Sequence, residues 1–146
     1  MSYNINLQHI IFRTAHSQPT IPEDTKRILL AYINSVSLGM GVTIKRINAW
    51  MNHVHILADV PVTVLLPDYV RKLKTTSSVA FRGYAGFPMF RGWARGYGSF
   101  SVSYYEKEHI ANYIKGQEDH HRYKTFAVKN FLAQKSRRGH TGNATG

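Results

Sequence analysis

The chain has 146 residues, of which 43% are hydrophobic and 18% charged, a composition typical of one folded domain and not of a disordered segment. It contains no cysteine, which excludes disulfides, thiolate metal sites and a cysteine nucleophile. No apolar run is long enough to span a membrane and no basic-then-apolar leader opens the chain, so we expect a cytoplasmic protein without a membrane partner.

Hydrophobic periodicity and turn residues predict eight elements in chain order. These are a strand at 3–13, a helix from Pro22 to about Leu38 that stops at Gly39 or Gly41, strands at 42–49 and 53–60, a helix at 68–80, a strand at 99–105, and helices at 106–121 and 125–135. The second and third strands are separated by only three residues and are expected to form a hairpin.

This order of elements predicts an α+β fold of the split βαβ type, as in ferredoxin-like and RRM-like domains. In that fold an antiparallel sheet carries helices on one face, and here a C-terminal helix bearing a tyrosine follows. We expect a single domain over residues 1–135 and a disordered tail at 136–146, which is polar and contains glycine.

The positive charge is concentrated in the second half of the chain. Nineteen Lys and Arg against eight Asp and Glu give a net charge of +11, which favours a polyanionic partner such as nucleic acid. No acidic residue lies between Asp68 and Glu106, and more than half of the aromatic residues fall in this interval. Cations interleaved with flat rings are typical of a surface that binds single-stranded DNA, although for any one ring a place in the core is the better interpretation. The candidate DNA-binding residues are Arg71, Lys72, Lys74, Arg82, Arg91 and Arg95.

The third predicted strand carries two histidines two residues apart. Because residues i and i+2 of a strand point to the same side, His53 and His55 are expected to lie together with Asp59 on the face opposite the core. Two adjacent imidazoles can bind a divalent metal ion. An incidental pair on a half-exposed strand is the alternative interpretation.

The third predicted helix carries a candidate nucleophile. Tyr113 and Gln117 are four residues apart, which places them one turn from each other on one helix face, and His109 extends this polar face. A tyrosine hydroxyl has a pKa of about 10 and is a poor nucleophile at neutral pH, but a metal that polarises a phosphate makes its attack feasible. A solvated polar face is the alternative.

Four sequence motifs occur together in one order. They are His53-Val54-His55, Lys-Leu-Lys-Thr-Thr-Ser-Ser at 72–78, Gly-Tyr-Gly-Ser-Phe-Ser-Val-Ser at 96–103, and Tyr-Ile-Lys-Gly-Gln-Glu-Asp-His-His at 113–121. Over residues 3–133 this pattern closely resembles the single-tyrosine transposases of small bacterial insertion sequences, which are members of the HUH nuclease superfamily.

The resemblance implies a DNA transposase that cleaves and rejoins single-stranded DNA through a 5′-phosphotyrosine and recognises DNA hairpins. It implies that Tyr113 is the nucleophile and that His53, His55 and Gln117 bind Mg²⁺ or Mn²⁺. It also implies a homodimer in which the tyrosine of one subunit can serve the histidines of the other.

Four other interpretations remain open. A domesticated relative that processes repeated chromosomal hairpins would share these residues. Replication initiators and plasmid relaxases share the chemistry but are usually larger. A non-catalytic RRM-like module that binds RNA would fit the fold and the charge. A metal-dependent hydrolase is the fourth, although Asp59 is the only nearby carboxylate.

Overall fold

The structure is a computed structural model that describes residues 4–116. Its strands are β1 (Leu7–Arg13), β2 (Thr43–Trp50), β3 (His53–Asp59) and β4 (Gly98–Ser101). Its α-helices are α1 (Lys26–Gly39), α2 (Leu66–Phe81) and α3 (Lys107–Lys115), and two short 3₁₀ turns are η1 (Ala15–Ser17) and η2 (Tyr104–Glu106). The helix expected at 125–135 and the tail at 136–146 lie outside the described residues.

The four strands form one sheet in the order β2-β3-β1-β4, and every neighbouring pair is antiparallel. Strand β3 therefore lies between β1 and β2, which run parallel to each other, and β1 lies in the same way between β3 and β4. This is the split βαβ arrangement, so the predicted α+β fold is confirmed. The predicted hairpin is also present, with Met51 and Asn52 as its turn.

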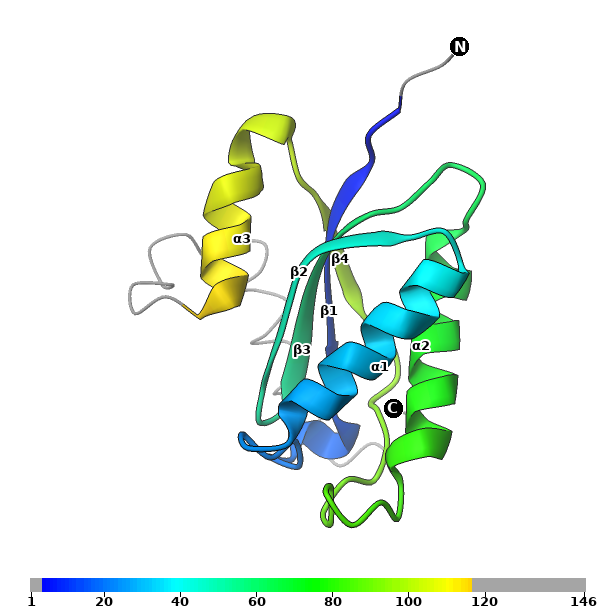
Figure 1. Cartoon of the computed structure of the whole chain (residues 1–146), viewed down its shortest axis with the longest axis vertical. Coiled ribbons are helices and arrows are strands. Elements are labelled where there is room, and N and C mark those ends of the chain that lie inside the picture. Colours follow the sequence, from blue (N-terminus) through cyan, green and yellow to red (C-terminus); the bar gives the residue numbers. More distant parts are fainter. Residues whose placement is uncertain (1–3, 117–146) are drawn as a thin grey trace.

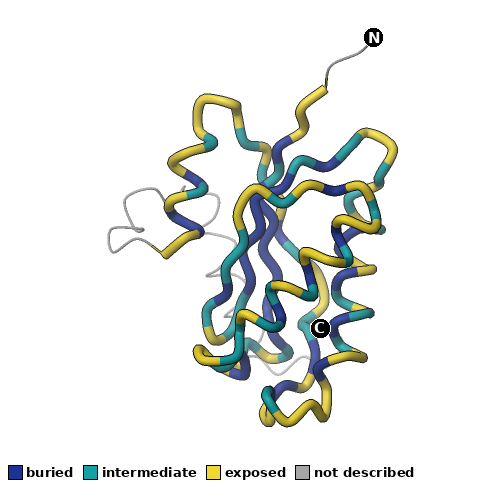
Figure 2. Tube along the Cα trace, viewed as in Figure 1, coloured by how far each residue is buried: buried dark blue, intermediate teal, exposed yellow. Residues whose placement is uncertain are grey.

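Helices lie on both faces of the sheet (Figure 1). Helices α1 and α2 cover one face, and the main core between them contains residues such as Phe12, Ile56 and Leu73. Helix α3 packs on the other face through a separate cluster made by Leu7, Leu57, Ile110, Tyr113 and Ile114. Figure 2 shows that the buried residues follow the central strands between these layers.

Several element boundaries differ from those expected. Helix α1 begins at Lys26, because the residues after Pro22 form a turn first. Strand β4 ends at Ser101, and Ser103 then begins η2 with a capping box in which its side chain and that of Glu106 bond each other's backbone amides.

The third helix is shorter than the predicted 106–121. It ends at Lys115, because Gly116 adopts a left-handed conformation with φ of 94° and donates its N–H to Asn112 and Tyr113. A glycine in this conformation is a common way for a helix to stop, since it has no Cβ to oppose a positive φ. Over residues 4–116 no helix is long and apolar enough to cross a membrane.

Candidate functional site

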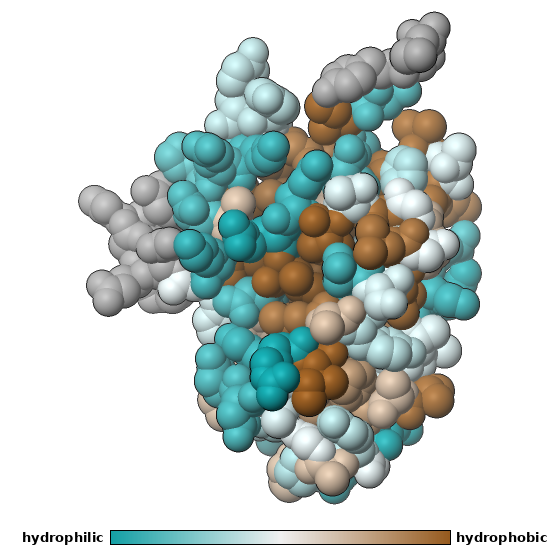
Figure 3. Space-filling model, viewed as in Figure 1, coloured by the Kyte–Doolittle hydropathy of each residue, from teal (hydrophilic) through white to brown (hydrophobic). Residues whose placement is uncertain are grey.

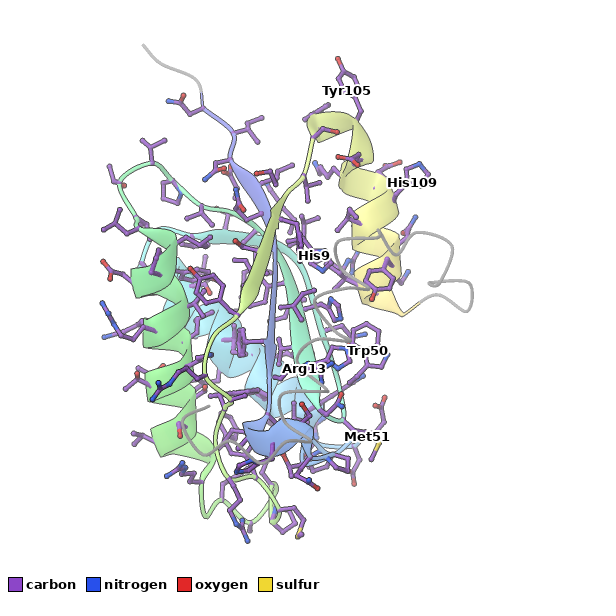
Figure 4. The ribbon with its side chains drawn as sticks, turned by 180° about the vertical axis from the view of Figure 1, so that it is seen from behind. His9, Arg13, Trp50, Met51, Tyr105 and His109 are labelled. Atoms are coloured by element: carbon purple, nitrogen blue, oxygen red, sulfur yellow. The ribbon has the colours of Figure 1, made fainter. Side chains whose placement is uncertain are left out.

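The strand register brings three histidines and an arginine to the sheet face under α3. Strand β3 contributes His53 and His55, and its neighbour β1 contributes His9 and Arg13. Arg13 is directly opposite His53 in the register. His9 is opposite Leu57, two positions before Ile11, which is opposite His55. The rings of His53 and His55 are 4.8 Å apart, centroid to centroid. The sequence-predicted pair is therefore on one face, and Figure 4 shows His9 and Arg13 on the same side of the sheet.

The turn before β3 orients the half-buried His53. Its Nδ1 lies 2.6 Å from Oδ1 of Asn52, whose amide nitrogen donates to the backbone oxygen of Ser17 at 3.4 Å. Ser17 and His16 both have φ of 57°, which is uncommon for residues other than glycine. Since the amide nitrogen of Asn52 faces Ser17, its oxygen faces the histidine and accepts a hydrogen bond from Nδ1–H.

His55 is completely buried, and its Nδ1 lies 2.8 Å from Nε2 of the equally buried His9. Burial lowers the pKa of His9 from 6.5 to about 4, because the charged imidazolium is poorly solvated there. His9 is therefore neutral at physiological pH. One nitrogen of this pair donates and the other accepts.

An aromatic side chain from β2 completes one wall of the site. The ring of Trp50 stacks on His53 with a centroid distance of 5.3 Å and an interplanar angle of 4°. It meets His55 edge to face at 4.8 Å. Trp50 thus holds both imidazoles in place, and it remains partly exposed at the edge of the site.

Tyr113 from α3 lies directly over the histidines. Its ring centroid is 5.2 Å from that of His55 and 6.0 Å from that of His9. Only 2% of Tyr113 is exposed, and burial raises the pKa of its hydroxyl from 10 to about 12. The tyrosine is therefore protonated at neutral pH and lies beside His55 and His9 of its own chain.

The expectation that Tyr113 lies on a polar helix face was wrong. Tyr113 lies three residues after Ile110 and immediately before Ile114, and all three are buried against the sheet. His109 is exposed on the outer side of α3 (Figure 4), and this outer side is hydrophilic (Figure 3). The other expected member of the face, Gln117, lies outside the described residues.

Two other tyrosines near α3 are poor candidates for the nucleophile. Tyr104 and Tyr105 lie in η2, and Tyr105 is 91% exposed and points away from the molecule (Figure 4). The position of Tyr113 above the imidazoles distinguishes it from this exposed pair.

The two imidazoles of His53 and His55 could supply two nitrogen ligands to a divalent metal ion. Each Nδ1 is engaged by a polar neighbour, Asn52 or His9, so Nε2 is the nitrogen that each ring would offer to a cation. Asp59 lies four residues beyond His55 on the same strand, and its carboxylate accepts the backbone N–H of Asn6. Between residues 4 and 116 no group of three or more His, Cys, Asp or Glu side chains is arranged to hold a metal ion, so a further ligand would have to be of another kind.

The predicted DNA-binding residues divide into two groups. Four of them, Arg71, Lys74, Arg82 and Arg95, line a groove of about 510 Å³ between α2 and the segment at 93–97. Trp93 and Tyr97 line the same groove. Lys72 and Arg91 are exposed outside it. The groove therefore combines cations with two rings, as the composition of this interval indicated.

One of these cations also has a structural role. Nζ of Lys74 donates to the backbone oxygens of Ala94 and Gly96, which fastens the 93–97 segment to α2. Arg71 forms an ion pair with Asp68 one turn earlier on the helix. Next to Lys74, the backbone N–H of Ala94 donates to the oxygen of Arg13 at 2.8 Å. The groove thus begins beside the strand end that carries Arg13.

Sequence reasoning missed three residues of the site: His9, Arg13 and Trp50. A signal existed for the first two, because His9 and Arg13 alternate with the apolar Ile10 and Phe12 on the first strand. Arg13 is only 5% exposed and its guanidinium donates to Oγ of Ser17, while burial lowers its pKa below the usual value for arginine. A buried guanidinium beside two imidazoles is an arrangement suited to a phosphate group.

Comparisons with known proteins concern the family and the fold of the chain. The family described as "Transposase IS200 like" matches residues 2–117. A solved structure of a protein from Deinococcus radiodurans described as a transposase is similar, with a TM-score of 0.60, 20% identity, and coverage of 80% of this chain and 95% of that one. A REP-associated tyrosine transposase bound to a REP hairpin is similar with a TM-score of 0.59, 14% identity, and coverage of 78% and 67%. Both likenesses support the fold. No curated protein matches the chain.

Proposed function

Because the chain belongs to the IS200-like transposases, we propose that it cleaves and rejoins single-stranded DNA at insertion-sequence ends through a 5′-phosphotyrosine on Tyr113. The observation that carries this proposal is the position of Tyr113, whose ring lies 5.2 Å from His55 on the sheet face that also holds His53 and Arg13. A nucleophile, two metal-binding imidazoles and a guanidinium in one place are the parts that phosphoryl transfer requires.

The cleavage step conserves bonds and charge. The phenol oxygen of Tyr113 forms a bond to the phosphorus, the bond from phosphorus to the 3′ oxygen breaks, and the phenol proton is balanced by the proton gained by the leaving 3′ hydroxyl. Because one phosphodiester replaces another, no external energy source is needed. Rejoining is the reverse reaction with a different 3′ hydroxyl.

The residues of the site have separate tasks in this step. His53, His55 and Gln117 would hold Mg²⁺ or Mn²⁺, which when bound stabilises the negative charge that develops on the phosphate. Arg13 lies beside His53 and can contact a phosphate oxygen. Trp50, stacked on His53, keeps the imidazole ring from rotating and excludes water from that side.

We propose that DNA, including a hairpin near the cleavage position, binds in the basic groove between α2 and residues 93–97. Four cations and two rings line the groove, and it begins beside Arg13 at the edge of the candidate active site. A strand leaving the groove could therefore reach the histidines around the end of β1. Binding through phosphate contacts should weaken steeply with added salt.

We also propose that the protein is a homodimer, because one small domain offers few surfaces for holding two DNA ends. Mass measurement in solution, with and without DNA, tests it directly.

The function is tested by Tyr113→Phe. The variant keeps the ring in its cluster with Ile110 and Ile114 and removes only the hydroxyl, so folding and DNA binding should be unchanged. Labelled single-stranded DNA with Mg²⁺ or Mn²⁺ should give a covalent protein adduct with the natural protein and none with the variant, on a denaturing gel. Tyr105→Phe is the matched control, because it removes the hydroxyl of an exposed tyrosine and should leave the adduct intact. An adduct formed by Tyr113→Phe would disprove the assignment.

A further inference from the structure

We propose that two residues with no assigned role, His9 and Asn52, are positioning residues that fix both His53 and His55 in the tautomer that carries its proton on Nδ1. The proposal rests on the proposed function in one respect. Metal binding by His53 and His55 requires a lone pair on the Nε2 atom of each ring.

The arrangement at His53 follows from the hydrogen bonds alone. The amide nitrogen of Asn52 donates to the backbone oxygen of Ser17, which turns its oxygen towards Nδ1 of His53 at 2.6 Å. An amide oxygen only accepts, so Nδ1 must carry the proton and Nε2 has the lone pair. The backbone oxygen of Asn52 also accepts from the N–H of Thr14 at 3.0 Å, so the turn is held from two sides.

The arrangement at His55 depends on His9. If Nε2 of His9 accepts, His55 carries its proton on Nδ1 and offers Nε2 to a cation. If Nε2 of His9 donates, the proton of His55 is on Nε2, and this nitrogen cannot bind a metal. Both rings are buried and belong to adjacent strands, so the 2.8 Å contact is fixed by the sheet register and not by a mobile side chain. His9 therefore determines which nitrogen of His55 is available.

The two residues act from different elements, one from β1 and one from the β2–β3 turn, and each contacts one histidine. Removing either one should therefore affect only its own partner. Partners that orient metal-binding histidines in this way typically contribute about 10- to 100-fold in metal affinity.

The test uses the full-length protein, labelled with ¹⁵N and without metal or DNA, in long-range imidazole NMR spectra. The natural protein should show both His53 and His55 protonated on Nδ1. His9→Met removes the acceptor at His55 and should shift that ring to a mixture of tautomers while His53 is unchanged. Asn52→Leu should shift His53 to a mixture of tautomers while His55 is unchanged. His9→Gln, which supplies an oxygen acceptor at about the position of Nε2, should restore the Nδ1–H form of His55.

Binding of Mn²⁺ alone, measured by its electron paramagnetic resonance signal, is the second readout. His9→Met and Asn52→Leu should each weaken it about 10- to 100-fold, and His9→Gln should recover most of the loss. A natural protein with His55 protonated on Nε2, or a His9→Met variant with unchanged tautomers and Mn²⁺ affinity, would overturn the proposal. If the tautomers change as expected but Mn²⁺ binds neither the natural protein nor the variants, the metal-binding role of His53 and His55 is refuted. Adduct formation by Tyr113 is a separate measurement and tests the proposed function independently.

Discussion

Truncation of Ile114 to alanine should release α3 from the sheet without unfolding the rest of the protein. Ile114 is completely buried, but within residues 4–116 its cluster contains five buried residues and is separate from the main core under α1 and α2. Replacing a buried isoleucine with alanine costs about 2–5 kcal/mol. Taking about 2–3 kcal/mol for this small cluster, amide protection within α3 should fall by about 30- to 150-fold.

Hydrogen exchange followed by mass spectrometry measures this effect segment by segment. Peptides covering residues 104–116 should lose protection in Ile114→Ala, while those from β1 and β3 should keep theirs. Ile33→Ala is the matched control, because it makes the same truncation in the main core and should lower protection across α1 and the sheet. Loss of protection that is equal in α3 and in the sheet would refute the separation of the two clusters. Unchanged protection in α3 would refute the docking itself.

Two further predictions concern the nucleophile and the groove. Tyr113 lies beside His55 of its own chain, so we expect it to act with the histidines of that chain. A mixture of the Tyr113→Phe and His55→Ala proteins should then form no adduct with DNA. If the helix of one subunit instead served the histidines of the other, mixed dimers would restore about a quarter of the natural activity. Lys74→Ala should destabilise the protein by about 1–3 kcal/mol in thermal unfolding, because it removes two hydrogen bonds to the 93–97 segment, while Lys72→Ala removes the same charge and should change stability by less than about 0.5 kcal/mol. Equal losses in the two lysine variants would contradict the structural role of Lys74.

The parts of the site that depend on local periodicity could be predicted from the sequence. The alternation along 53–60 placed His53 and His55 on one face, and the short connection before them predicted the hairpin that carries Trp50 and Asn52. These features involve residues close together in the chain, where strand geometry alone decides which side a residue faces.

The parts of the site that depend on pairing between distant segments could not be predicted from the sequence. Whether β1 lies beside β3 is decided by the whole sheet, so the contact between His9 and His55 across 46 positions has no local signal. The helix face of Tyr113 was misjudged for a different reason. The expected helix was continued through Gly116, which aligned Tyr113 with Gln117, whereas the glycine ends α3 and the apolar Ile110 and Ile114 place Tyr113 against the sheet.

The two faces of the sheet have different physical tasks. The face under α1 and α2 is apolar and supplies the main core. The other face buries two imidazoles and a guanidinium and half-buries the imidazole of His53, and such groups are costly to bury without partners. Asn52, Ser17 and the histidines themselves satisfy part of that cost through hydrogen bonds. Tyr113 and His55 are almost fully covered, so a phosphate can reach them only if the site opens. Because α3 packs through a small separate cluster, follows the capping box of η2 and ends at Gly116, we expect it to move as a unit while the main core stays intact.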